Sequence, residues 1–600
     1  MKGIIYLTLA IVLALTIALP VIAVTPQSIN TFSCTDVTEI PQIECEALVA
    51  LYNSTNGAGW LDNTNWLATN TPSNWFGVSV NSGYVTSLSL IYNQLNGSLP
   101  PELGNLTSLI RMDLVSNQLT GSIPPELGNL ISLTSLSLCW NQLTGSIPAE
   151  LGNLINLTWL HLGGNQLTGS IPPELGNLTS LRYLYLWLNQ LSGSLPPELG
   201  NLTNLKAFNL QSNQLTGSIP PELGNLTNLV DYLVLRTNHL SGSIPPELGD
   251  LISLTWLDLG WNQLTGSIPL ELGSLTNLTN IDLSGNQLTG SIPPEFGNLT
   301  NLGGLSLSVN QLTGNIPPEL GSLTNLTNVD LYGNQLTGNI PPELGNLTSL
   351  TSLALYSNQL SGSIPPELGN LINLQILRLN DNQLEGDVPD TFINLTNLLD
   401  PGMVWDGGDG LDLDYNILNV PPSYPDPGNP LHVFLSQKDP DWNLLQAFEQ
   451  VIGTGGGEIT SLDGKTGLVI PAGALVGDTT FTFIPQPAPT HDPGRLIFAY
   501  NSFQITAEDA YGNPVTAFNL PITVTLTYAD TDIIGMPEYS LGLYYWDGGA
   551  SAWADAVSTC PGGEYTRDPA ANSFALPLCH LTKFGLFGNP LHFFLPIVRR

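Results

Sequence analysis

The chain has 600 residues, of which 42% are hydrophobic and only 10% are charged. This composition is typical of a folded protein, and the length is too great for one core, so we expect two or more domains. The formal charge is −36, from 13 Lys and Arg against 49 Asp and Glu; such a surface repels phosphate backbones and anionic lipids and excludes nucleic acid as a partner.

The N-terminus has the pattern of a secretory signal peptide. Lys2 is followed by an almost wholly apolar stretch over residues 3–19 and by a small-residue site that ends at Ala23. The pattern predicts a signal peptide over residues 1–23 and a secreted or cell-surface protein, with no membrane insertion after cleavage. The alternative is an uncleaved anchor helix, because residues 3–24 are long enough to span a bilayer.

Five cysteines fit an exported chain. Cys34 and Cys45 lie close together in one small region, and Cys560 and Cys579 flank a short loop in another. Because exported proteins form disulfides, we predict two local bridges, one within each pair. Cys139 lies inside a repeat and is expected to be a free thiol.

A 24-residue repeat dominates the middle of the chain. The triplet Asn-Gln-Leu, or a close variant, recurs thirteen times with a step of 24 residues, except for one step of 25. A degraded copy that ends at Asn416 follows a ten-residue insertion. The thirteen full copies begin at Asn93, Asn117, Asn141, Asn165, Asn189, Asn213, Asn238, Asn262, Asn286, Asn310, Asn334, Asn358 and Asn382.

Each repeat predicts one coil of a solenoid. In the third, Leu136 and Leu138 alternate with serines, the period of a short strand with one buried face. Asn141 follows where the chain must turn, and its amide can bond backbone groups of neighbouring coils. Proline pairs and the short Glu150-Leu151-Gly152-Asn153-Leu154 stretch leave room for at most one helical turn. Since no coil can bury its own leucines, the coils must stack into a parallel sheet on the order of 60 Å long.

The unit resembles the plant-type leucine-rich repeat. The resemblance rests on stretches such as Leu119-Thr120-Gly121-Ser122-Ile123-Pro124 and covers residues 85 to about 398. It implies an α/β-type solenoid over residues 85–420, with mostly short parallel strands, a second short strand at Thr-Gly-x-Ile-Pro and a 3-10 or irregular convex side. It also implies binding of proteins, peptides or glycans.

Residues 30–84 resemble the amino-terminal cap of that family, through Trp60, Trp66 and the Trp75-Phe76-Gly77-Val78 core. In the plant cap, cysteines flank this core, whereas this chain has Ser73 and Val80. The resemblance therefore implies that the Cys34–Cys45 pair replaces the missing bridge. A cap is needed because the first coil would otherwise expose its apolar face.

The chain changes character after residue 420. A proline-rich run predicts a linker over residues 421–440, and alternating segments such as Thr479-Thr480-Phe481-Thr482-Phe483-Ile484 predict an all-β antiparallel sandwich over residues 441–588. Glycine-rich and Ile-Pro-Ala-Gly segments at 456–460 and 470–475 make it similar to the ZU-five-like sandwich. Some relatives cleave themselves at His-Phe-Ser; the triplet here is Lys583-Phe584-Gly585, so we expect no self-cleavage. Residues 589–600 resemble short tails on bacterial secreted proteins.

The sequence contains no signal for an enzyme, a cofactor or a metal. The six histidines include no metal-spaced pair, and no Gly-x-Ser-x-Gly motif is present. Asp406, Asp409, Asp412 and Asp414 crowd the insertion before the last coil. A calcium site is one interpretation, but the spacing is not that of an EF-hand, and solvated loop acids are preferred.

The variable positions of the repeats predict a binding surface. Repeats differ mainly beside the two strand leucines, at positions expected to face the concave side, and large aromatic residues on a protein surface mark interaction sites. We predict a protein, peptide or polysaccharide ligand there; the alternatives are a structural or adhesion protein in which the solenoid is a spacer, and a hydrolase-inhibitor-like or receptor-ectodomain-like module. The predicted site comprises Tyr92, Trp140, Trp159, His161, Tyr183, Tyr185, Trp187, Tyr232, Arg236, Trp256 and Trp261. Later repeats carry Asp258, Asp282 and Asp330 instead.

Overall fold

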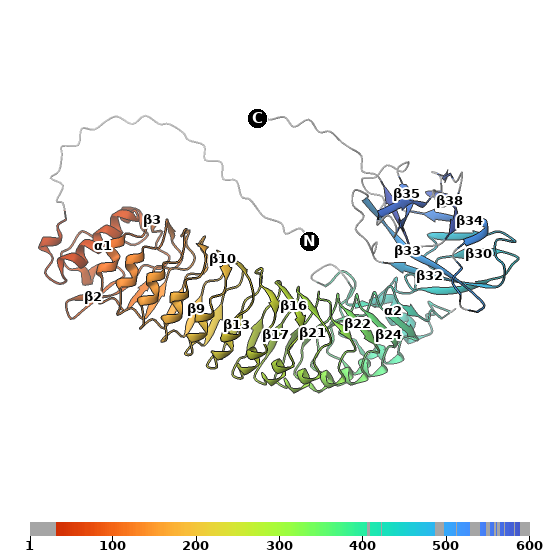
Figure 1. The fold of residues 1–600 in the computed structure, drawn as a ribbon, viewed down its shortest axis with the longest axis horizontal. Helices are drawn as coiled ribbons and strands as arrows, with labels where there is room; N and C mark the ends of the chain where they lie inside the picture. The colour runs from red at the N-terminus through yellow and green to blue at the C-terminus, as the bar shows by residue number, and fades with distance from the viewer. Residues whose placement is uncertain are drawn as a thin grey trace, which may run out of the picture.

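The predicted signal peptide and the C-terminal tail lie outside the part of the chain that the structure describes. The structure is a computed structural model, and the residues it describes are 32–404, 409–421, 423–486, 497–511, 513–515, 517–528, 541–547, 552–556, 560, 564–568, 571–580 and 583–588. A solenoid arc carries an aromatic-rich cap at its N-terminal end and a separate β domain at its C-terminal end (Figure 1).

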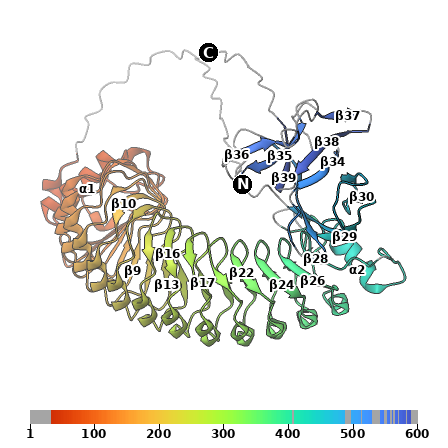
Figure 2. The same ribbon diagram turned by 45° about the vertical axis from the view of Figure 1, so that its right-hand side comes forward.

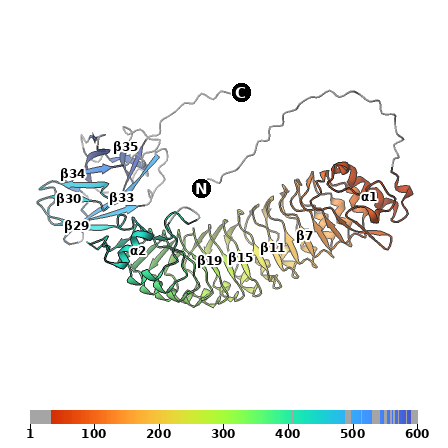
Figure 3. The same cartoon turned by 180° about the vertical axis from the view of Figure 1, so that it is seen from behind.

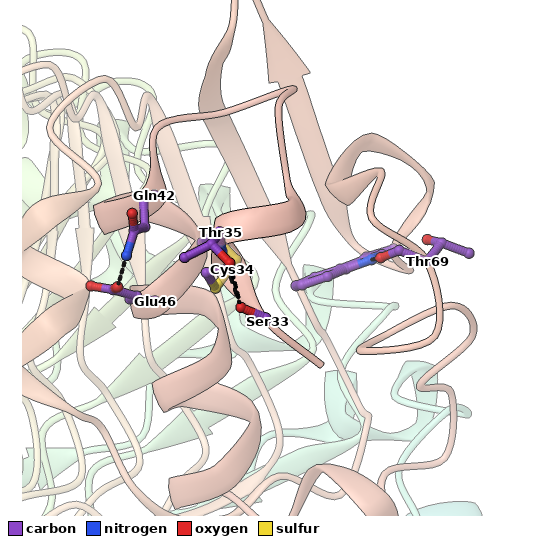
Figure 4. The surroundings of a disulfide bond; sticks show 8 residues. Ser33, Cys34, Thr35, Gln42, Glu46 and Thr69 are labelled. Carbon is purple, nitrogen blue, oxygen red and sulfur yellow. Dashed lines mark hydrogen bonds between the residues drawn. A yellow bond between two sulfur atoms is a disulfide. The ribbon is translucent and has the colours of Figure 1, made fainter. Parts of the chain in front are cut away.

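The N-terminal cap consists of the 3-10 turn η1 (Cys34–Asp36), the helix α1 (Gln42–Ser54) and the turns η2 (Gly57–Gly59) and η3 (Pro72–Asn74). Buried Trp60, Trp66 and Trp75 form its centre, with ring centroids 4.9 and 5.0 Å apart along the series. A disulfide joins Cys34 to Cys45 and ties η1 to α1, as predicted (Figure 4).

A single sheet of fifteen strands runs the length of the solenoid. The strand β1 (Val78–Asn81) pairs antiparallel with β2 (Tyr84–Ser89), and every later pairing is parallel and in register from coil to coil. The remaining strands are β4 (Arg111–Asp113), β6 (Ser135–Ser137), β7 (Trp159–His161), β9 (Tyr183–Tyr185), β11 (Ala207–Asn209), β13 (Tyr232–Val234), β15 (Trp256–Asp258), β17 (Asn280–Asp282), β19 (Gly304–Ser306), β21 (Asn328–Asp330), β23 (Ser352–Ala354), β25 (Ile376–Arg378) and β27 (Leu411–Asp412).

A second, interrupted row of strands lies at the Thr-Gly segments, where the family resemblance placed it. It forms sheets of two, three, three and five strands. These strands are β3 (Asn96–Ser98), β5 (Gln118–Thr120), β8 (Thr168–Gly169), β10 (Gln190–Ser194), β12 (Gln214–Thr216), β14 (Ser241–Ser243), β16 (Gln263–Ser267), β18 (Gln287–Thr289), β20 (Thr313–Gly314), β22 (Gln335–Gly338), β24 (Gln359–Ser363), β26 (Gln383–Gly386) and β28 (Ile417–Leu418).

Each coil returns through one 3-10 turn, and these turns line the outer edge of the arc (Figure 2), so the long sheet lines its concave side. Neighbouring turns approach closely: a Cβ added to Gly104 would lie 2.4 Å from the carbonyl oxygen of Glu126. Glycine is required there for that reason. The turns are η4 (Pro101–Asn105), η5 (Pro125–Asn129), η6 (Ala149–Asn153), η7 (Pro173–Asn177), η8 (Pro197–Asn201), η9 (Pro221–Asn225), η10 (Pro246–Asp250), η11 (Leu270–Ser274), η12 (Pro294–Asn298), η13 (Pro318–Ser322), η14 (Pro342–Asn346), η15 (Pro366–Asn370) and η16 (Asp390–Asn394).

The interior of the solenoid is built from leucine and asparagine, as predicted. Leu136 and Leu138 are fully buried. Asn141 Oδ1 accepts the backbone amide of Leu119 in the preceding coil at 3.0 Å, and its Nδ2 donates to the carbonyls of Leu114 and Leu138 at 3.0 Å each. The same bonds recur from coil to coil, so each buried amide satisfies backbone groups of two coils.

The prediction that residues 421–440 form a linker is wrong. They contain the helix α2 (Pro430–Lys438), whose Leu431 and Leu435 join the solenoid core together with Trp442. Lys438 Nζ donates to the Leu398 carbonyl at 2.6 Å, which fixes α2 to the last coils. This segment therefore covers the apolar face that the last coil would otherwise expose, and the β domain begins at β29, from Phe448, rather than at residue 441.

The C-terminal domain consists of two antiparallel sheets with their own core, which includes Phe481, Phe503 and Phe574 (Figure 3). One sheet has the order β29-β32-β33-β39-β35-β36 and the other β30-β31-β34-β38-β37. The second predicted disulfide, Cys560–Cys579, is present, and Cys139 is a buried free thiol. The strands are β29 (Phe448–Ile452), β30 (Gly457–Thr460), β31 (Thr466–Ile470), β32 (Thr479–Gln486), β33 (Ile497–Asp509), β34 (Ala517–Thr527), β35 (Leu541–Asp547), β36 (Ala552–Asp555), β37 (Thr566–Asp568), β38 (Ser573–His580) and β39 (Lys583–Gly588).

Within the described residues, no helix has both the length and the apolar character that crossing a bilayer requires.

Candidate functional site

The concave sheet presents two side chains from each three-residue strand. In β7 the central Leu160 points into the core, so Trp159 and His161 point outward. The parallel register places Trp159 beside Tyr183 and His161 beside Tyr185 of the next coil. Side chains that are 24 residues apart in the sequence therefore form continuous columns along the sheet.

Eight rings on this face form one connected network, which we call the aromatic belt. Each ring contacts at least one other, with centroid separations between 4.8 and 6.5 Å. Both tryptophans at its ends are largely exposed, Trp140 by 51% and Trp256 by 43%. The belt comprises Trp140, Trp159, His161, Tyr183, Tyr185, Trp187, Tyr232 and Trp256.

Two adjacent glycines position the tryptophans at one end of the belt. A Cβ on Gly163 would lie 2.7 Å from the Trp187 indole, and a Cβ on Gly164 would lie 2.8 Å from the Trp140 indole. Both indoles therefore lie directly on the backbone of the coil between them, with their centroids 5.2 Å apart. A larger residue at either glycine would displace them.

A small residue also connects the two halves of the belt. Ala207 pairs in register with Tyr183 on one side and Tyr232 on the other. Because its methyl group occupies little space, Tyr185 and Tyr232 approach across the coil between them, with centroids 6.2 Å apart and planes inclined by 24°. The belt is therefore continuous across a coil that contributes no ring.

The structure corrects the expectation that all eleven predicted residues form one exposed surface. Tyr185 is only 9% exposed, and burial raises the pKa of its hydroxyl. His161 is partly buried, and its Nε2 has no hydrogen-bond partner among the residues that the structure describes. Desolvation lowers the pKa of His161 to about 4, against an opposing effect of Asp113. These two side chains support the belt from within rather than face solvent fully.

Tyr92, Trp261 and Arg236 lie outside the belt. The first two are exposed, occupy the turn after the strand with positive φ angles of 53° and 54°, and contact no ring of another described residue. Arg236 instead forms an ion pair with Asp282 and lies 3.6 Å from Asp258. The sequence pattern did not distinguish these three residues from the members of the belt, because each of them occupies a variable position beside the strand leucines of its own repeat.

Beyond the belt, the concave face has a hollow with an acidic wall. It has a volume of about 170 Å³ and lies over Gly304 and Ser306 of β19. Desolvation and repulsion from Asp282 raise the pKa of Asp258 to about 6 and that of Asp330 to about 6. A stacked pair that the sequence analysis did not single out, Tyr332 and Tyr356, follows in the next two coils with centroids 4.4 Å apart.

A second group of acids lies where α2 meets the last coil, outside the concave hollow. One carboxylate oxygen each from Asp412, Asp414 and Asp439 lie within 4.8 Å of one another, and Asp409 and Asp441 form a second such trio with Asp439. Burial raises the pKa of Asp412 to about 6 and that of Asp414 to about 8. The interpretation of Asp412 and Asp414 as solvated loop acids is therefore wrong; the trios have the oxygen chemistry of a divalent-cation site. Asp406 lies outside the described residues.

The comparisons with known proteins agree with this architecture. A two-copy model of leucine-rich repeats matches residues 155–201. A single-copy model, Leucine Rich Repeat, matches ten segments: 84–106, 108–130, 132–154, 204–226, 253–275, 277–299, 301–323, 325–347, 349–371 and 373–395. No curated protein matches the chain.

Solved structures with sequence similarity include two receptors. A structure described as that of a TDR receptor and a plant peptide hormone receptor, RGFR1 in complex with RGF2, are each 37% identical with a TM-score of 0.51. The matches cover 54% and 55% of this chain, which spans only 55% of the length of each receptor. A leucine-rich-repeat protein of Leptospira interrogans is 35% identical; that match covers 58% of this chain and 81% of the other, with a TM-score of 0.46.

Proposed function

The chain belongs to the leucine-rich-repeat family, and from this premise we propose that it is an extracellular, non-catalytic protein that binds a protein or peptide ligand on the concave face of its solenoid. The similarity to a plant peptide hormone receptor in complex with RGF2 supports a ligand of this class. Two disulfides support a location outside the reducing cytosol.

The aromatic belt is the observation that carries the proposal. Its rings pack against one another rather than into the leucine core, and Trp140 and Trp256 remain about half exposed. Monomeric proteins rarely leave connected aromatic surface in water, and tryptophan and tyrosine dominate the binding energy of protein interfaces. A solenoid that served only as a spacer would have no use for such a surface.

The test is capture of partners from culture medium by the chain without residues 1–23. The double variant Trp140→Ala with Trp256→Ala removes the exposed ends of the belt. The matched control, Tyr92→Ala with Trp261→Ala, removes two rings that are also exposed, by 68% and 46%, but lie outside the belt. We expect the belt variant to lose capture by about tenfold or more and the control to keep it.

Both variants should keep their melting temperatures within a few degrees, because all four side chains are largely exposed. Equal capture by the wild type and the belt variant would contradict the proposal and favour a structural spacer. If the chain instead bound a neutral polysaccharide on a glycan array and the belt variant did not, the belt would still be the binding surface, but its ligand would be a polysaccharide and not a protein or peptide.

A further inference from the structure

We infer that the ligand of the concave face is an extended segment of a partner protein that places a lysine or arginine side chain in the hollow over Gly304 and Ser306, between Asp282 and Asp330. The inference rests on the proposed function and specifies the chemistry of its ligand. It is carried by the shape of the hollow, by its charge and by its position beside the aromatic belt.

The hollow exists because one strand has small side chains. In register with Gly304, the neighbouring strands carry Asn280 and Asn328, and in register with Ser306 they carry Asp282 and Asp330. The missing side chain of Gly304 and the short one of Ser306 leave the depression of about 170 Å³ with carboxylates on both sides. The end of one long side chain, entering from solvent, fits a space of this shape.

The charges in the hollow are unbalanced. Arg236 is the cation that faces Asp258 and Asp282, and it pairs with both. Asp282 also accepts hydrogen bonds from the amide and hydroxyl of Ser284. Asp330, on the far side, accepts no hydrogen bond from any side chain or amide in the described part of the chain, and repulsion from Asp282 opposes its ionisation.

The hollow therefore holds three buried or partly buried carboxyl groups, those of Asp258, Asp282 and Asp330, and one guanidinium group, so it lacks positive charge. A guanidinium or ammonium group between Asp282 and Asp330 would supply charge-assisted hydrogen bonds to both. Charge complementarity therefore selects a basic side chain from among the groups that a peptide can offer.

The aromatic surroundings favour an organic cation on a peptide over a sugar. Trp256 lines the same hollow and is 43% exposed, so a cation entering it can also lie against an indole face. Along the belt, ring planes are inclined by 44° to 84° in all pairs but that of Tyr185 and Tyr232. Because neighbouring rings are inclined to one another, the belt as a whole has no broad flat face, and its mixture of ring faces and edges suits the irregular side chains of a peptide.

The distance between the belt and the hollow sets a spacing in the ligand. Tyr232 in β13 lies three strands before Gly304 in β19, which is about 14 Å at about 4.8 Å per strand. An extended peptide along the sheet axis advances about 3.4 Å per residue, so about four residues span that distance. We therefore expect an apolar anchor about four positions from the basic residue.

The experiment uses a display library of random 12-residue peptides, selected on the chain without residues 1–23. The strongest peptides are then made with a fluorescent label, each beside a counterpart in which glutamine replaces the basic residue, and dissociation constants are measured by anisotropy. The test variant is Asp330→Asn. The matched control is Glu319→Gln, the same change of charge at an exposed position of η13 on the convex side.

We expect enrichment of peptides with a basic residue about four positions from an aromatic or aliphatic one. Binding should weaken by about tenfold or more in Asp330→Asn and in the glutamine counterpart, and remain unchanged in Glu319→Gln. Enriched peptides that lack a basic residue, or that bind Asp330→Asn as tightly as the wild type, would overturn the inference and leave the proposed function standing. No enrichment at all would overturn both, and so would binding of neutral polysaccharide alone on a glycan array.

Discussion

The side chain of Gln446 bonds to the backbone around Leu418 as the asparagine of each preceding coil bonds to its neighbour. Its Oε1 accepts the amide of Leu418 at 3.1 Å, just as Asn416 Oδ1 accepts the amide of Leu384 at 3.0 Å. Its Nε2 donates to the carbonyl of Leu413 at 3.1 Å. A glutamine from the segment after α2 therefore supplies the last rung of the interior amide ladder.

Replacing Gln446 with alanine should loosen the last coil. The change leaves the Leu418 amide buried without its partner, at a cost of about 1–3 kcal/mol, while the Leu413 carbonyl keeps the bond that Asn416 Nδ2 donates to it at 3.0 Å. Hydrogen exchange of residues 411–418 should become faster, while coils nearer the N-terminus keep their protection, because a solenoid couples mainly nearest neighbours.

The control for Gln446→Ala is Gln450→Ala, which removes an exposed bond from Gln450 to the carbonyl of Glu458. That variant should leave exchange in residues 411–418 unchanged. Equal effects of the two substitutions would show that Gln446 does not close the solenoid.

Adding one methyl group at Gly163 should break the aromatic belt without straining the backbone. The new Cβ would lie 2.7 Å from the Trp187 indole, so the indole must move away from Trp140 and His161. Near-ultraviolet circular dichroism, which reports the packing of aromatic rings, should change, and capture of ligand should fall. In the control Gly303→Ala, the new Cβ makes only an ordinary contact at 3.5 Å with the carbonyl of Thr279, and neither signal should change.

Acid should destabilise the belt through His161. Desolvation lowers the pKa of His161 in the folded protein to about 4, below its unfolded value of 6.5, so the unfolded chain binds the proton more readily. The stability from neutral His161 is present above pH 6.5 and is lost as the pH falls toward 4. Melting temperatures measured between pH 7 and 4 should fall less for His161→Phe than for the wild type. Parallel curves would refute a neutral, desolvated His161.

Asp330 should behave in the opposite sense. Burial and repulsion from Asp282 raise the pKa of Asp330 in the folded protein to about 6, above the ordinary 3.8, so the folded protein binds the proton more readily than the unfolded chain. The protonated carboxyl group therefore stabilises the fold fully below pH 3.8, and this stabilisation is lost as the pH rises through 6. Asp330→Asn should therefore raise the melting temperature at pH 7.5 and have little effect at pH 4. The control Glu319→Gln should change neither value. A variant that is less stable at pH 7.5 would mean that Asp330 has a favourable partner when it is ionised.

The repeat alone was sufficient to predict the solenoid. Thirteen near-identical copies require thirteen equivalent coils, and the period-two pattern around Leu136 fixes which side chains face inward, because a shift of one residue would expose every leucine. The buried asparagines and both disulfides were predicted for similar local reasons.

The sequence could not show where the solenoid ends. Trp442 and Gln446 close it from residues that were predicted to belong to the β-sandwich, directly after the predicted linker, and nothing local links them to Leu413 or Leu418. Only the packed structure brings that segment across the open end, because the apolar face of the last coil must be covered by whatever part of the chain can reach it.

The sequence determined which residues stand at the variable positions, and the tertiary structure decided what each of them does. Trp140 and Trp187 meet because Gly163 and Gly164 leave room between them, and Arg236 turns to Asp282 two coils away. These contacts between coils arise because the coils stack at a fixed spacing. Tyr185 is buried by Trp159 and Tyr232, which belong to other coils, and nothing in its own repeat predicts that burial.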